Sequence, residues 1–189
     1  FSKIMTEAIK KKIPVVRLDR GCNIRLDDRT HMNVLNPDRD YTMSGLSLNN
    51  SSLVLKLHYE DVSFLFTGDI EREIEEHMVG KKIDLKADVL KVAHHGSDTS
   101  SSVEFIKGVS PKAAVISVGK NNFGHPSPSV LKAYRDFGIP IFRTDESGAI
   151  VVLSDGKRIW IRETIKIKKT TQNTKFIGGW CYELQSFAK

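Results

Sequence analysis

Residues 62–97 read VSFLFTGDIEREIEEHMVGKKIDLKADVLKVAHHGS and contain two apolar runs separated by a Glu-rich segment. The runs at 62–66 and 87–93 are short and compact, which predicts two buried strands. Between them, apolar residues recur at the spacing of one helix face: Ile70, Ile74 and Met78. This order of strand, helix and strand predicts the α/β fold class.

The alternation of strands and helices continues toward both ends of the chain. Residues 53–57 alternate leucine with other residues and then turn at Glu60-Asp61, which predicts a hairpin before the strand at 62–66. Ser101-x-x-Glu104 and Ser127-Pro128 have the sequences of helix starts. The other expected elements are a helix ending at 10–12 and strands at 14–18, 23–26, 32–35, 113–118, 139–143, 149–153 and 158–163.

The composition is that of a globular protein. The chain has 189 residues, of which 40% are hydrophobic and 28% are charged, and this excludes a disordered or low-complexity protein. Its only cysteines, Cys22 and Cys181, are far apart, which excludes a disulfide framework and a thiolate zinc finger. No apolar run approaches 18 residues, so the sequence predicts neither a membrane span nor membrane contact by this chain.

The positive charge is concentrated at the carboxyl end. Residues 157–189 hold eight basic and two acidic residues, an excess that equals the net charge of +6 for the whole chain. We therefore predict one domain over 1–156 and a basic extension over 157–189. Two interpretations of the extension stay open. It binds a polyanion such as nucleic acid, or it is an ordinary solvated surface.

Three polar clusters follow consecutive predicted strands. They are Thr67-Gly68-Asp69, His94-His95-Gly96-Ser97 and Gly124-His125-Pro126. In an α/β sheet, ligands bind in loops at the carboxyl ends of strands, so we expect all three at one edge. A carboxylate with imidazoles suits Zn²⁺ or Mn²⁺. Taken alone, Asp69 has a second interpretation, as the N-cap of the following helix.

The same residues resemble a known family. The run at 49–55, the Leu65-to-Asp69 segment, the Asp88-to-Ser97 segment and residues 116–126 together resemble the metallo-β-lactamase superfamily. The similarity is greatest to the hydrolase domain of the ComEC-type DNA-uptake competence proteins and extends over about residues 1–153. The resemblance implies the carboxyl-side portion of an αββα sandwich, with two mixed sheets packed face to face and helices outside.

The resemblance also implies roles for individual residues. It assigns Asp69 as a bridge between two divalent cations, Zn²⁺ or Mn²⁺, and His94 or His95 as a further metal ligand. We favour His94 as the ligand and His95 as a contact to substrate or to a ligand. His125 either contacts a phosphate or protonates a leaving group, or it only orients its loop. Substrate contacts are implied for Ser97, Asn121 and His125.

One expected motif is missing. The His-x-His-x-Asp-His motif that supplies the other metal ligands in this family does not occur, and the remaining histidines, His31, His58 and His77, stand alone. Either the motif lies upstream of Phe1 in a longer parent protein, which we favour, or this is a degenerate member without metal. We therefore expect the chain alone to be inactive and to bind divalent metal weakly.

The function implied by the resemblance is metal-dependent hydrolysis of a phosphodiester, with single-stranded DNA as the substrate. The alternative is a non-catalytic module that binds nucleic acid or an acidic partner through its basic extension. The location is left open. It is cytoplasmic for a stand-alone relative, and on the extracytoplasmic face of a membrane if the parent protein is ComEC-like and carries a membrane domain.

Overall fold

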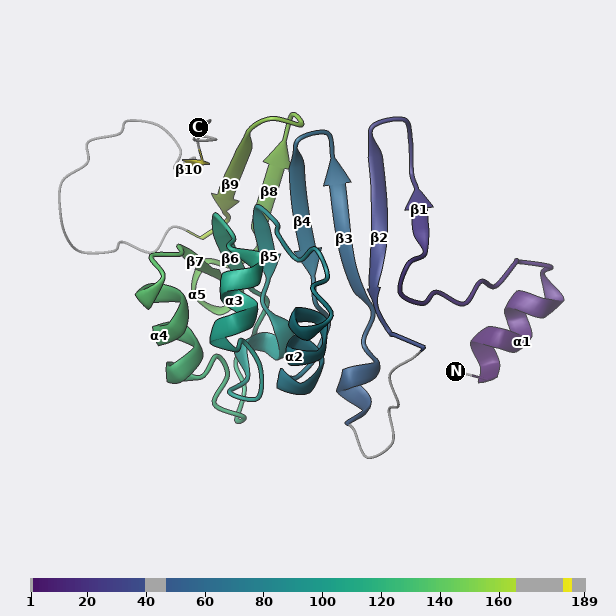
Figure 1. Cartoon of the computed structure of the whole chain (residues 1–189), viewed down its shortest axis with the longest axis horizontal. Helices are drawn as coiled ribbons and strands as arrows, with labels where there is room; N and C mark the ends of the chain where they lie inside the picture. Colours follow the sequence, from purple (N-terminus) through teal and green to yellow (C-terminus); the bar gives the residue numbers. More distant parts are fainter. Residues whose placement is uncertain (1, 40–46, 166–181, 185–189) are drawn as a thin grey trace.

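The computed structural model describes residues 2–39, 47–165 and 182–184 (Figure 1). A seven-stranded sheet lies at its centre, and the order of the strands follows the chain from β1 to β7. β1 to β4 pair antiparallel, whereas β4 to β7 pair parallel. The strands are β1 (Asn23–Arg25), β2 (Thr30–Asn36), β3 (Val54–Tyr59), β4 (Val62–Phe66), β5 (Val89–Lys91), β6 (Ala113–Ile116) and β7 (Ile141–Arg143).

Helices cover one face of this sheet. α2 (Arg72–Gly80), α3 (Val103–Val109) and α4 (Pro128–Asp136) pack their apolar residues against Leu65, Leu90 and Ile116 in the main core. The other helical segments are α1 (Ser2–Lys10), α5 (Thr144–Ser147) and the 3₁₀ turns η1 (Leu48–Ser51) and η2 (Ala93–Gly96). Burial of this many aliphatic side chains is the main source of stability for the layer.

A second sheet packs on the opposite face. It consists of β8 (Ile150–Ser154), β9 (Ile159–Glu163) and β10 (Tyr182–Leu184), all antiparallel. Ile159 and Ile161 are buried against the large sheet, where they contact a second apolar core. The described residues thus form three layers, helices, mixed sheet and small sheet, as expected for the carboxyl-side portion of an αββα sandwich. The prediction of two mixed sheets is wrong for the smaller one.

The strand expected at 14–18 is not present. Among the described strands the sheet ends at β1, so none of them pairs with this segment, and Val15 and Val16 are exposed. A strand needs a partner for its backbone hydrogen bonds, and alternation in the sequence does not supply one.

The domain boundary predicted at residue 156 falls inside the β8–β9 hairpin. Asp155 makes the turn by accepting the N–H groups of Lys157 and Arg158, and Ile161 is fully buried. Residues up to Glu163 therefore belong to the folded unit. Most of the predicted basic extension, including Lys166, Lys168, Lys169, Lys175 and Lys189, lies outside the described residues.

Within the described ranges, no helix has the length and apolar composition needed to cross a membrane.

Candidate functional site

The carboxyl ends of β4, β5 and β6 meet at one edge of the sheet, because these strands are parallel and adjacent. Two glycines let the following loops approach each other. A Cβ on Gly68 would lie 2.6 Å from the Cβ of Ser52, and a Cβ on Gly96 would lie 2.7 Å from the Cβ of Pro126. Both glycines also have positive φ angles, which disfavour a side chain. The loops therefore pack closely and bring their side chains to one place.

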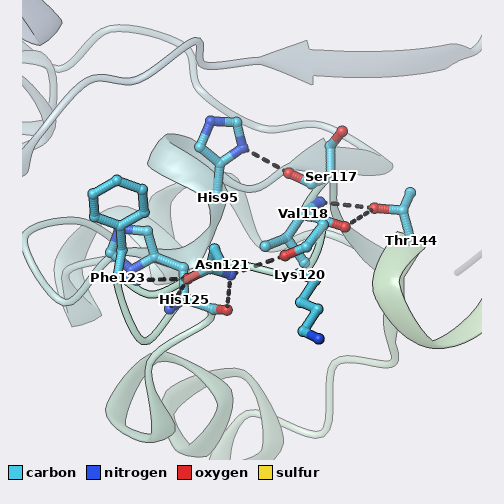
Figure 2. A pocket seen from close by; sticks show the side chains of 9 residues that line it. His95, Ser117, Val118, Lys120, Asn121, Phe123, His125 and Thr144 are labelled. Atoms are coloured by element: carbon cyan, nitrogen blue, oxygen red, sulfur yellow. Dashed lines mark hydrogen bonds between the residues drawn. The ribbon is translucent and has the colours of Figure 1, made fainter.

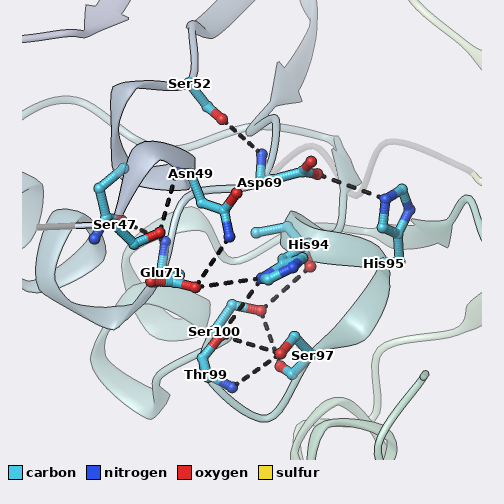
Figure 3. A network of polar contacts seen from close by, with 12 residues as sticks. Ser47, Asn49, Ser52, Asp69, Glu71, His94, His95, Ser97, Thr99 and Ser100 are labelled. Atoms are coloured by element: carbon cyan, nitrogen blue, oxygen red, sulfur yellow. Dashed lines mark hydrogen bonds and ion pairs between the residues drawn. The ribbon is translucent and has the colours of Figure 1, made fainter. Parts of the chain in front are cut away.

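Asp69 follows β4 and does not cap the next helix. α2 begins at Arg72, and Glu71 occupies the cap position. The backbone N–H of Asp69 donates to Ser52 Oγ at 3.0 Å, while its carboxylate is 43% exposed (Figure 3). The interpretation of Asp69 as a helix cap is therefore wrong. Its carboxylate is left available at the edge of the sheet.

His94 and His95 follow β5 in the turn η2, where both have left-handed backbone angles, with φ of 46° and 55°. His95 Nε2 lies 3.7 Å from Asp69 Oδ1, and His94 Nδ1 lies 3.6 Å from Glu71 Oε1 (Figure 3). The structure thus places His95, and not the favoured His94, next to Asp69.

The hydrogen bond on the far side of His95 assigns its tautomer. His95 Nδ1 lies 2.6 Å from the carbonyl oxygen of Ser117. A carbonyl only accepts, so Nδ1 carries a proton, and in the neutral form of the ring Nε2 presents a lone pair toward Asp69. Metal-binding histidines are commonly held in this way by a backbone carbonyl.

Glu71 is a site residue that carries no recognisable motif in the sequence. Its Oε1 accepts Asn49 Nδ2 at 3.2 Å, and its N–H donates to Asn50 Oδ1 at 2.8 Å. The sequence at 49–52 is conspicuously polar. It does not show, however, that Asn49 and Asn50 hold Glu71 in place after β4. Glu71, the residue that precedes α2, also contacts His94.

His125 completes the cluster from the loop after β6. Its ring centroid lies 5.6 Å from that of His94. Burial, with the nearby imidazoles of His94 and His95, lowers the pKa of His125 below its usual value. Its Nδ1 is buried and has no hydrogen-bond partner within the described residues. The ring is therefore mostly neutral at pH 7, and its Nδ1 is not used by the described part of the fold.

The predicted substrate contacts of Ser97 and Asn121 are not supported by their surroundings. Ser97 is buried, and its hydroxyl lies 3.0 Å from Thr99 Oγ1. The amide of Asn121 donates to the carbonyls of Gly119 and His125 and accepts the N–H groups of Phe123 and His125. Both side chains are fully used in shaping their loops.

A cavity of about 480 Å³ opens beside these residues (Figure 2). His95 lies on one side of it, and Phe123 and His125 lie on another. Its other lining residues are Ser117, Val118, Gly119, Lys120, Asn121 and Thr144. The cluster therefore has space for a substrate.

The donor atoms fit a cation but provide an incomplete set. Two ligands of one tetrahedral Zn²⁺ are about 3.4 Å apart, given metal–ligand distances near 2.1 Å. The 3.7 Å between Asp69 Oδ1 and His95 Nε2 is close to this value. In the part of the chain that the structure describes, no three His, Cys, Asp or Glu residues form a group that could hold a metal. His31 does not contribute, since it stacks on His58 at the opposite end of the sheet.

Comparisons with known proteins show what the chain is similar to. Residues 46–120 match the model of the metallo-beta-lactamase superfamily. ComE operon protein 3 of Bacillus subtilis is 38% identical over 149 residues, 78% of this chain and 19% of that protein. Competence protein ComA of Neisseria gonorrhoeae is 43% identical over 104 residues, 54% of this chain and 15% of that protein.

Two further proteins are more distant. Recombination protein 2 of Haemophilus influenzae is 32% identical over 123 residues, 65% of this chain and 15% of that protein. A crystal structure of a suggested metal-dependent hydrolase from Parabacteroides distasonis is 15% identical, with a TM-score of 0.46, over 72% of this chain and 60% of that chain. The chain spans less than a fifth of the length of the curated relatives it matches.

Proposed function

Because the chain belongs to the metallo-beta-lactamase superfamily, we propose that it forms the carboxyl-side part of a metal-dependent hydrolase that cleaves phosphodiester bonds in single-stranded DNA. The names of two relatives, competence protein and recombination protein, fit a DNA substrate. The net charge of +6 fits a polyanion.

The facing acceptors of Asp69 and His95 carry this proposal. Asp69 Oδ1 and His95 Nε2 lie 3.7 Å apart, and Ser117 accepts the proton on the opposite side of the His95 ring, so in the neutral form of this ring both facing atoms are acceptors. Two acceptors in this arrangement repel each other unless a proton or a cation lies between them. The separation is too long for a hydrogen bond between the two groups, and it fits two ligands of one ion.

The residues of this chain would hold the metals as follows. Asp69 and His95 would hold one cation, and the remaining nitrogen of His94 would be available to a second, because Glu71 faces the other nitrogen of that ring. When bound, two cations, Zn²⁺ or Mn²⁺, lower the pKa of a water molecule and neutralise phosphate charge. The identity of the cations is not fixed by these donors, since oxygen and nitrogen ligands suit both.

His125 acts on the substrate as a neutral ring. Its lowered pKa keeps it uncharged at pH 7, so it offers one N–H as a hydrogen-bond donor to a phosphate oxygen. Because the pKa of His125 is lowered, little of the protonated form is present at pH 7. This favours the phosphate contact over protonation of the leaving group.

The proposal is tested with Asp69→Ala in the intact protein. We expect cleavage of a labelled single-stranded oligonucleotide in Mn²⁺ to fall at least 100-fold, because a metal ligand is lost. The thermal midpoint should be unchanged, since the side chain is not a helix cap. Asp136→Ala, which removes an exposed carboxylate on α4, is the control and should cleave like the parent. Turnover by Asp69→Ala within about tenfold of the parent would contradict the metal role.

A second function is favoured by the incomplete ligand set within the described residues. A superfamily member without metal would be a non-catalytic module that binds nucleic acid or an acidic partner. Metal analysis of the intact protein separates the two. Stoichiometric Zn²⁺ or Mn²⁺ supports the hydrolase, and its absence after purification and reconstitution supports the module.

A further inference from the structure

Phe123 has an unusual environment for a large apolar residue. It lies in the loop after β6 and is 83% exposed. Its ring is nearly parallel to that of His125, with an angle of 22° and a centroid distance of 6.0 Å (Figure 2). One face of Phe123 is therefore supported by a neighbouring ring, while the rest of the side chain is open to solvent.

The loop that carries Phe123 is held in place. The side chain of Asn121 makes four hydrogen bonds to the backbone of residues 119–125, all between 2.8 and 3.1 Å. Directly after it, Ser127 caps α4 by accepting the N–H of Val130. Little conformational entropy is then lost when a ligand binds to the ring. The exposure of Phe123 is a feature of an ordered loop.

The location of the ring identifies the kind of ligand. Phe123 lines the 480 Å³ cavity that also contains His95, the residue next to Asp69. Lys120 lies on the same rim, and in the described part of the chain it has no ion pair. A flat apolar surface with a cation beside it is the combination by which proteins bind single-stranded nucleic acids, through base stacking and phosphate contact.

We propose that Phe123 is a stacking platform for a nucleobase of a single-stranded nucleic acid, next to the site that Asp69 and His95 form. This inference rests on the proposed function and adds a residue that selects the substrate. A base within a duplex is already stacked on both faces and cannot use the platform unless it is flipped out. The site therefore prefers single strands over duplexes.

Binding without cleavage tests the platform. The full chain is titrated, in EDTA, against a fluorescent oligothymidylate of about 12 nucleotides and against an abasic oligomer of the same length. The variants are Phe123→Ala, Phe123→Trp and the control Phe137→Ala, which removes a phenylalanine 41% exposed at the end of α4. Because Phe123 is so exposed, its substitution should leave the thermal midpoint unchanged.

We expect Phe123→Ala to weaken binding of oligothymidylate between about 5- and 100-fold, the range for loss of one stacked base. Phe123→Trp should bind as well as the parent or more tightly, and Phe137→Ala should match the parent. The abasic oligomer should bind the parent and Phe123→Ala equally.

Equal affinity of the parent and Phe123→Ala for oligothymidylate would overturn the inference, as would failure of the parent to bind it. An equal loss on the abasic oligomer would also overturn it, since that result shows a role without base stacking. Cleavage by the intact protein is measured separately. Binding that depends on Phe123 without any cleavage would contradict the proposed hydrolase and leave the platform in place.

Discussion

His94 and His95 have backbone angles that side chains seldom adopt, and each such residue costs on the order of 1–2 kcal/mol. Strain of this kind persists where the surrounding structure holds it, and it is common at functional sites. Here the turn directs the two adjacent imidazoles to different carboxylates, Asp69 and Glu71. A regular strand would also point them apart, but to opposite faces of the sheet.

This geometry makes a prediction about the two histidines. In the intact protein, His95→Ala should weaken Mn²⁺ binding by at least tenfold, because the partner of Asp69 is lost. His94→Ala should weaken binding by no more than His95→Ala does. Isothermal titration of metal into the two variants measures both. A larger loss for His94→Ala would restore the original preference for His94.

Sequence reasoning located the cluster better than it assigned the roles within it. Asp69, His94, His95 and His125 are expected together because each follows a predicted strand of an α/β sheet, and the positions of these strands along the chain can be predicted from the apolar pattern. Which histidine lies next to Asp69 depends on the backbone angles of the turn η2, and the apolar periodicity of the sequence does not predict these angles. Glu71 was missed for the same reason.

At the scale of elements, Glu75 connects α2 to the loop that follows the two histidines. Its side chain is fully buried, and its two oxygens accept the N–H groups of Ser101 and Ser102 at 2.6 and 2.7 Å. These bonds explain why α3 starts one residue later than the Ser101-x-x-Glu104 pattern predicts. Ser101 binds Glu75, and Ser102 caps the helix by accepting the N–H of Phe105.

Replacing Glu75 should separate the loop from the helix. In Glu75→Gln, an amide NH₂ would face a backbone N–H, so one donor stays unsatisfied and the free energy of unfolding should fall by about 1–3 kcal/mol. Glu76→Gln, at the neighbouring exposed position, is the control and should be neutral. Urea denaturation measures both variants. A neutral Glu75→Gln would show that the two bonds contribute nothing to stability.

The effect of Glu75→Gln should also depend on pH. Burial raises the pKa of Glu75, so the folded chain keeps this proton to a higher pH than the unfolded chain, in which the group titrates near 4.5. The contribution of this proton to the free energy of unfolding is fully present below pH 4.5, and it is lost as the pH rises through the pKa of Glu75 in the folded chain. Relative to the parent, Glu75→Gln should therefore be less destabilised at about pH 7.5 than at pH 4.5. If the difference in unfolding free energy between Glu75→Gln and the parent is the same at both pH values, the raised pKa of Glu75 is contradicted.

Across the whole molecule, the second sheet covers only part of the large one. Beside β8 lies an apolar cavity of about 450 Å³ whose lining includes Leu57, Phe64 and Phe66. Phe66 is 39% exposed there. The described structure thus has an exposed apolar face on the sheet. The boundary at residue 156 rests on the distribution of charge, which does not show that Ile159 and Ile161 are buried in the strand after the turn.

This face predicts association of the isolated chain. About 80 Å² of Phe66 is exposed, which corresponds to about 2 kcal/mol if it is buried between two copies. Phe66→Ser should therefore weaken self-association at least tenfold in sedimentation velocity and reduce the fluorescence of a bound hydrophobic dye. Leu48→Ser, which removes a leucine 90% exposed in η1, should change neither. Circular dichroism checks that both variants fold. If Phe66→Ser self-associates like the parent, the prediction is wrong. The chain then associates through another surface, and the face around Phe66 stays exposed to solvent in the isolated chain.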